Sequence, residues 1–78
     1  MSYSPDNIAE LEVLMLFDLN NTQEGIKIHK TAEETVISAA KRLFEKGFIT
    51  QVDGGYLTDL GTEGAEHAQQ LHLMLNAG

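Results

Sequence analysis

The sequence predicts an α+β fold, with three main helices and a small antiparallel sheet made of a short strand plus a β-hairpin. Apolar residues recur at helical spacing in three segments, 5–19, 32–46 and 59–76. Between the last two segments, β-branched and aromatic residues flank Asp53-Gly54-Gly55, a pattern typical of a hairpin turn. Seventy-eight residues suit one folding unit, so we expect a single domain over 1–78.

The first helix is expected to run from residue 5 to about residue 19. Ser4 can cap it by accepting a hydrogen bond from a free backbone N–H, and Pro5 has the backbone angle that the first helical position needs. Apolar residues spread around its later turns, so this helix is either central to the core or shared with a partner chain. Glu10 and Glu12 are expected on its solvent-exposed side.

A short strand and a second helix come next. The segment 26–29 alternates apolar and polar residues, which predicts a strand able to pair with the hairpin. Thr31 and Glu34 form the capping-box pattern at the start of the helix 32–46. Gly47 follows the last turn and is positioned to end it.

Helical spacing divides this second helix into two faces. We expect the buried face to contain Val36, Ile37, Ala40, Leu43 and Phe44. We expect the face left to solvent to contain Thr35, Ser38, Lys41, Arg42 and Glu45.

The hairpin is expected to consist of 48–52 and 56–58, after which Thr58 can cap a third helix over 59–76. Gly61 and Gly64 weaken its first turns but permit close approach of another helix or of the sheet. Its end is more apolar than one buried face requires, because it contains Leu71, Leu73, Met74 and Leu75. We therefore expect a homodimer formed through the terminal helices, 5–19 and 59–76.

The charges are distributed unevenly along the chain. The net charge is −7, yet all five basic residues fall within 26–47, where three acids leave a local net charge of +2. The remaining nine acids lie outside that segment with no compensating base. This asymmetry is either a surface feature used for binding or a chance clustering in a small protein.

Several kinds of site have no pattern in the sequence. There is no cysteine, no nucleophile with a paired base and no phosphate-binding loop, and His67 and His72 are too far apart in sequence to share one helix face for a metal. We therefore expect no enzyme activity, metal, cofactor or small-molecule ligand. The longest apolar run is far too short to cross a membrane, and no signal peptide is visible, so we expect a cytoplasmic protein without membrane contact.

The stretch from Thr35 to Thr50, followed by Gly55 to Gly61, resembles winged helix-turn-helix regulators of the multiple-antibiotic-resistance (MarR) type. Those proteins carry R-L-x-x-K-G-(L/F)-(I/V) at the end of the recognition helix, and L-T-x-x-G after the wing. The matching residues are Arg42, Leu43, Lys46, Gly47, Phe48, Ile49, Leu57, Thr58 and Gly61. The resemblance covers roughly 26–62, and the whole chain also resembles a small family of uncharacterised bacterial proteins that are usually assigned to DNA binding. It implies a winged-helix-like domain.

Two functions follow from this resemblance and the charges. The first is a transcriptional regulator that places the helix 32–46 in the major groove of double-stranded DNA, with weak and salt-dependent affinity. Its candidate DNA contacts are Lys27, Lys30, Thr35, Ser38, Lys41, Arg42 and Lys46. The alternative is a winged-helix protein-interaction or dimerisation module that does not bind DNA. The acidic surface, the lack of a positioning helix in the segment 20–30 and the apolar C-terminal helix 59–76 favour this alternative.

Overall fold

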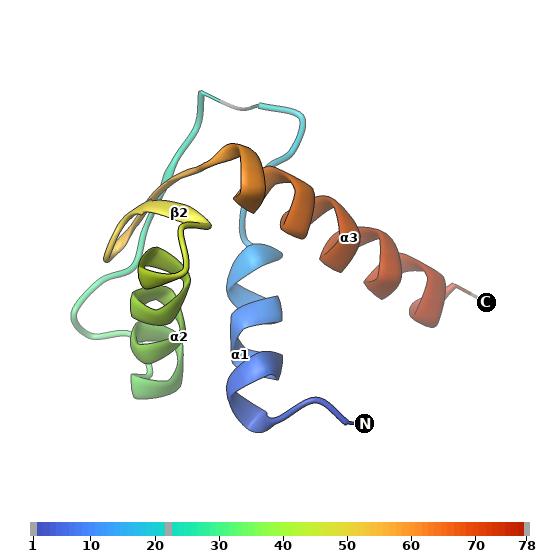
Figure 1. Cartoon of the computed structure of the whole chain (residues 1–78), viewed down its shortest axis with the longest axis horizontal. Coiled ribbons are helices and arrows are strands. Elements are labelled where there is room, and N and C mark those ends of the chain that lie inside the picture. The colour runs from blue at the N-terminus through green and yellow to red at the C-terminus, as the bar shows by residue number, and fades with distance from the viewer. Residues whose placement is uncertain (1, 22, 78) are drawn as a thin grey trace.

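The structure has the α+β, winged-helix-like architecture that the sequence predicts. The computed structural model describes residues 2–21 and 23–77. The elements are α1 (Pro5–Leu14), β1 (Ile26–Lys27), α2 (Glu34–Glu45), β2 (Ile49–Gln51), β3 (Gly54–Leu57) and α3 (Asp59–Asn76) (Figure 1). Strand β1 is the expected third strand, because it pairs with β3 and gives the antiparallel sheet the order β1-β3-β2.

Helix α1 begins as predicted but ends earlier. The Ser4 hydroxyl accepts a hydrogen bond from the Asn7 N–H at 3.1 Å. The helix stops at Leu14 instead of residue 19, and the chain then turns so that Phe17 is buried in the core. The side-chain amide of Gln69, on α3, donates to the carbonyl oxygens of Leu14 at 3.4 Å and Phe17 at 2.8 Å. Gln69 therefore supplies the hydrogen bonds that these carbonyl groups would have received from backbone N–H groups in a longer helix.

The start of α2 differs from the predicted capping box. Glu33 occupies the N-cap position and makes no side-chain capping hydrogen bond. Thr31 instead lies in a turn, where the Ala32 N–H donates to the His29 carbonyl at 3.0 Å. The predicted end of the helix is confirmed, since Gly47 follows it with a positive φ of 84° that favours glycine.

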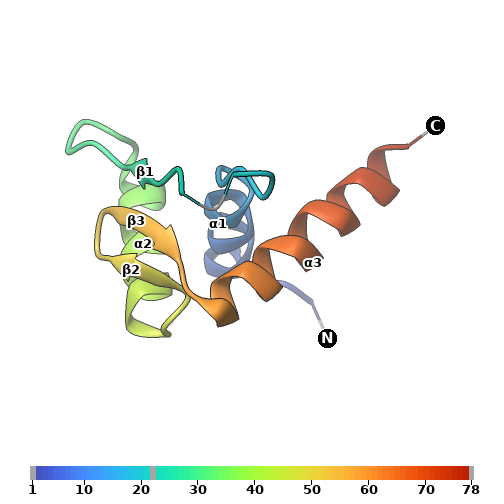
Figure 2. The same cartoon turned by 90° about the horizontal axis from the view of Figure 1, so that it is seen from above.

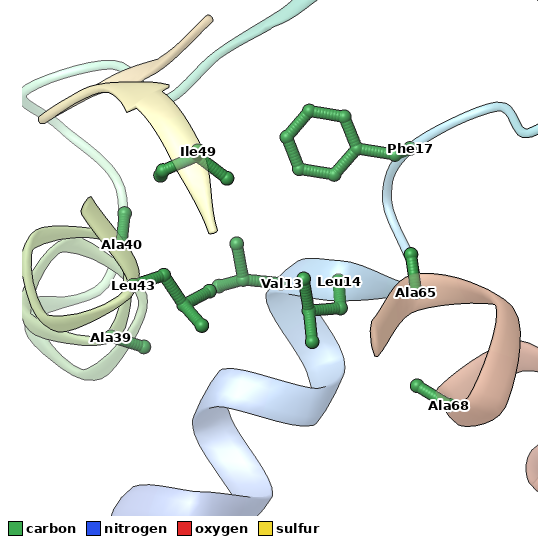
Figure 3. Close-up of a cluster of buried hydrophobic side chains, with 9 residues drawn as sticks. All are labelled: Val13, Leu14, Phe17, Ala39, Ala40, Leu43, Ile49, Ala65 and Ala68. Atoms are coloured by element: carbon green, nitrogen blue, oxygen red, sulfur yellow. The ribbon is translucent and has the colours of Figure 1, made fainter. Parts of the chain in front are cut away.

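The buried face of α2 is also rotated from the prediction. Ala39 is fully buried together with Ala40 and Leu43, whereas Phe44 is 42% exposed and does not belong to the core. Ala39 is buried because it lies on the side of α2 that packs against α1 (Figure 3). The side chain of alanine is short, so this contact brings the two helices close together.

The hairpin turn lies one residue earlier than predicted. Val52 and Asp53 connect β2 to β3, and the positive φ angles belong to Gly54 (124°) and Gly55 (72°) within β3. A Cβ atom at Gly54 would lie 2.6 Å from the carbonyl oxygen of Ile26. The glycine therefore allows β1 to approach the bare backbone of β3, which is a different role from forming the turn.

A small core lies between the three helices and β2, with α1 in the middle (Figure 3). Its buried apolar residues are Val13, Leu14, Phe17, Ala39, Ala40, Leu43, Ile49, Ala65 and Ala68. Val13 points toward Leu43 of α2, and Leu14 lies on the side of Ala65 in α3. Helix α1 is therefore the element that connects the other two.

Helix α3 has the predicted bounds and the predicted cap. The Thr58 hydroxyl accepts from the Gly61 N–H at 3.0 Å and donates to the Gly47 carbonyl at 2.6 Å, so it also joins the end of α2 to the start of α3. The predicted close approach at Gly61 is confirmed, and its neighbour is the carbonyl group of Phe48. Beyond the core, α3 projects away from the body (Figure 2). Within the described part of the chain, none of the helices has the length and apolar character needed to cross a membrane.

Gly61→Ala is expected to destabilise the protein by about 2–3 kcal/mol, because the added methyl group would overlap the Phe48 carbonyl oxygen. In an ordinary helix the same change stabilises by up to about 1 kcal/mol. Urea unfolding of the wild type and of the Gly61→Ala variant measures the change in the free energy of unfolding. Gly47→Ala is the control, since its Cβ meets nothing within 4 Å and it should lose only about 1 kcal/mol from the positive φ. A Gly61→Ala variant as stable as the wild type would contradict this packing.

Candidate functional site

The structure separates the seven candidate DNA-binding residues into two groups. Three lysines line a groove on one side of α2, and four residues are directed toward α1. The first group is Lys27, Lys30 and Lys41. The second group is Thr35, Ser38, Arg42 and Lys46.

Glu10 of α1 accepts hydrogen bonds from two residues of the second group, Arg42 and Lys46. Its Oε2 accepts from Arg42 Nε at 2.7 Å, and its Oε1 accepts from Lys46 Nζ at 2.9 Å. Arg42 also contacts Asp6, with Nη2 at 3.8 Å from the carboxylate and 3.3 Å from the backbone carbonyl oxygen. These bonds join α1 to α2 and neutralise two of the five basic side chains.

The predicted position of Glu10 in solvent is therefore wrong. Its side chain is only 9% exposed. Glu10 precedes Val13 and Leu14 by three and four residues, so it lies on the same helical stripe that enters the core. That spacing, together with two bases four residues apart on the second helix, was the sequence signal for the ion pairs.

Arg42 and Ser38 also differ from the prediction of a solvent-exposed face. The Arg42 side chain is 28% exposed, and Ser38 is half-buried. Together with Thr35, they line a shallow hollow whose other wall is formed by α1. A nucleic acid that reached Arg42 would have to compete with Glu10 and Asp6 for its guanidinium group.

The environment of Glu10 determines its charge. Burial raises the pKa of this carboxyl group, but the hydrogen bonds from Arg42 and Lys46 outweigh burial, so the pKa lies below its ordinary value of 4.5. The carboxylate therefore stays ionised at neutral pH and keeps both bases in place.

The first group surrounds what we call the lysine-rimmed groove, which has a volume of about 670 Å³. Its apolar lining residues are Ile28, Ile37, Ala40 and Val52, and its rim carries Lys27, Lys30 and Lys41. It lies between α2, the connection from β1 to α2, and the tip of the hairpin. Sequence reasoning missed this groove, because its walls come from three segments that only the fold brings together.

The three lysines of the groove are less constrained than Arg42. Lys27 Nζ lies 3.7 Å from Asp53 Oδ2, but both side chains are well exposed and such pairs are weak. Among the described residues, neither Lys30 nor Lys41 forms an ion pair. Positive charge available to a partner is therefore concentrated at this groove.

A second apolar surface lies at the end of α3. The exposed fractions are 40% for Leu71, 65% for Leu73, 65% for Met74 and 75% for Leu75. Figures 1 and 2 show that this part of the helix extends beyond the other elements. The predicted excess of apolar residues here thus corresponds to a surface that the described residues, 2–21 and 23–77, leave exposed.

Comparison with models of known protein families found a match over nearly the whole chain. Residues 1–76 match a family model described as a family of unknown function, DUF5669. Comparisons with curated proteins and with solved structures found no significant match. The possible functions must therefore be argued from these surfaces.

Glu10→Gln is expected to lower the free energy of unfolding by about 1–3 kcal/mol at neutral pH, because Arg42 and Lys46 lose their charged acceptor. The lowered pKa of Glu10 means that its ion pairs stabilise the fold above pH 4.5 and lose this effect as the pH falls through the folded-state pKa. The difference between wild type and variant should therefore shrink below pH 4.5.

Urea unfolding at neutral and acidic pH measures this difference. Glu12→Gln is the matched control, because Glu12 is exposed on the same helix and forms no ion pair among the described residues. An effect of Glu10→Gln that is equally large at acidic pH would contradict the role of the charge.

Proposed function

Because the chain belongs to the DUF5669 family, whose function is unknown, we propose a function from the geometry: a winged-helix-like interaction module that pairs with a second copy through its terminal helices. The observation that carries this proposal is the uncovered apolar end of α3. A cytoplasmic location is part of the proposal, since a chain without cysteine needs no oxidising compartment.

The apolar end of α3 continues a face that is already buried. Gly61, Ala65 and Ala68 pack against the body of the protein. The same helical line continues at Leu71 and Leu75, which remain 40% and 75% exposed among the described residues. Burying one leucine side chain contributes about 1.5–3 kcal/mol, so two copies that cover these residues gain substantial stability.

The distribution of charges permits two copies to pair through the apolar end of α3. Each copy carries a net charge of −7, so association of two surfaces outside the basic segment 26–47 and the segment 67–76 brings acidic groups together. The segment 67–76 contains neither Asp nor Glu, and also no Lys or Arg. Two copies can therefore pair there with apolar contacts and with little repulsion between nearby charges.

Leu75→Glu is expected to weaken the dimer at least tenfold, because it places a carboxylate in each half of the apolar contact. Leu75 is 75% exposed, so the fold of one copy should not change. Sedimentation equilibrium over a range of concentrations measures the effect. Val52→Glu makes the same kind of change at an exposed residue of the hairpin tip, and it should leave the dimer intact. A wild-type chain that stays monomeric at all concentrations would contradict the proposal.

DNA binding by α2 is the second candidate, favoured by the three exposed lysines that line a groove on one side of that helix. Phosphate contacts from Lys27, Lys30 and Lys41 would give weak, sequence-independent binding. Glu33 and Glu34 are exposed at the start of α2 and would repel phosphates. Arg42, the candidate for reading guanine, would first have to leave Glu10.

Fluorescence anisotropy with a labelled mixed-sequence duplex tests this second candidate. Three phosphate contacts predict that log K falls against log salt concentration with a slope of about −3. Lys41→Gln should reduce that slope by about 1, since it removes one contact. Asn20→Asp changes the net charge equally at an exposed loop position and should leave the slope unchanged. The candidate fails if the wild type does not bind the duplex at low salt.

A further inference from the structure

We propose that the lysine-rimmed groove binds a short, acidic, amphipathic peptide segment of a partner protein. This surface is separate from the apolar end of α3, because none of the residues 71–75 lines the groove. The proposal thus adds a second binding surface to a chain that pairs with its own copy.

The groove lies between α2 and the chain that connects β1 to α2, which forms neither a helix nor a strand. Ile28 and Ile37 therefore remain only half-buried, and Val52 at the hairpin tip is 52% exposed. These side chains form an apolar surface around the fully buried Ala40. An apolar surface of this kind favours a partner that inserts bulky apolar side chains.

The size and shape of the groove favour a peptide over a small molecule. Its volume of about 670 Å³ can hold several apolar side chains. It is open to solvent, so a small ligand would keep much of its surface in water. A peptide can insert its apolar side chains here and keep its backbone outside the groove.

The charges around the groove indicate the sign of the partner. Lys27, Lys30 and Lys41 lie on the rim, and Asp53 is the carboxylate that lines it among the described residues. The two other basic residues of the chain are held by Glu10. Carboxylates placed beside the apolar residues of a peptide would therefore meet the positive charge that remains available.

Two other occupants fit less well. The apolar end of α3 from a second copy contains no carboxylate over 67–76, so it would leave the three lysines unmatched. A DNA backbone would match the lysines, but it would cover Ile28, Ile37 and Val52 with phosphates and sugars instead of apolar groups. An acidic amphipathic peptide matches both properties.

The test uses fluorescein-labelled peptides and the full chain in anisotropy titrations. The first peptide presents leucines at i, i+3, i+4 and i+7, with glutamates on the flanking positions. A second peptide carries lysines in place of the glutamates, and a third carries serines in place of the leucines. We expect the first peptide to bind at least tenfold more tightly than the other two, and to weaken as salt is added.

Substitutions at residues that line the groove test whether the peptide binds there. Lys41→Gln and Val52→Ser should each weaken binding of the first peptide by roughly three- to fivefold, through loss of a charge and of an apolar contact respectively. Asn20→Asp matches the charge change of Lys41→Gln away from the groove, and it should bind as the wild type does. Leu75→Glu should also retain peptide binding, so a failure of the dimer and a failure of the groove give different results.

The amide NMR signals that shift on peptide addition should belong to 27–31, Ile37, Lys41 and Val52. Four results would overturn the proposal. These are equal binding of the acidic and basic peptides, a Lys41→Gln variant no weaker than Asn20→Asp, shifts confined to 71–75, or a DNA duplex that binds at the groove while the acidic peptide does not.

Discussion

The rest of the structure depends on the ion pairs that the Glu10 carboxylate forms with Arg42 and Lys46. The carboxylate accepts hydrogen bonds from both bases and so fixes α1 against α2. Helix α1 in turn supplies Val13 and Leu14 to the core between α2 and α3. A buried carboxylate without partners would be destabilising, so the two bases stabilise α1 in this position.

The same ion pairs change how the basic segment can function. In sequence, five basic residues within 26–47 form one cluster. In the fold, Arg42 and Lys46 are held by α1, whereas Lys27, Lys30 and Lys41 lie around an apolar groove. The positive surface is therefore smaller than the sequence indicates, and it adjoins apolar side chains. A protein partner matches this combination better than a DNA backbone does.

The features that sequence predicted correctly depend on neighbouring residues. Ser4, Gly47 and Thr58 act within one or two turns of the helix ends that they define, and the bounds of α3 follow from such signals. The winged-helix-like order of elements follows from the same local patterns.

Apart from the capping box at the start of α2, the features that sequence reasoning missed depend on residues far apart in the chain. Helix α1 ends early because Phe17 enters the core and Gln69 bonds its carbonyl. Gly54 lies within β3, where its lack of a side chain allows the backbone of Ile26 to pack closely. The hairpin turn is therefore formed by Val52 and Asp53 instead of Asp53 and Gly54. The groove and the burial of Glu10 likewise require the packed structure, since periodicity along one segment does not reveal which residue it will meet.

The most direct test of this account is a pH titration of the Glu10 side-chain carboxyl carbon by NMR. We expect a pKa below 4.5 in the wild type. We expect a pKa above 4.5 in the Arg42→Gln, Lys46→Gln double variant, where burial remains but both charged donors are gone. A Glu10 pKa at its ordinary value in both proteins would show that the carboxylate does not hold the two helices together.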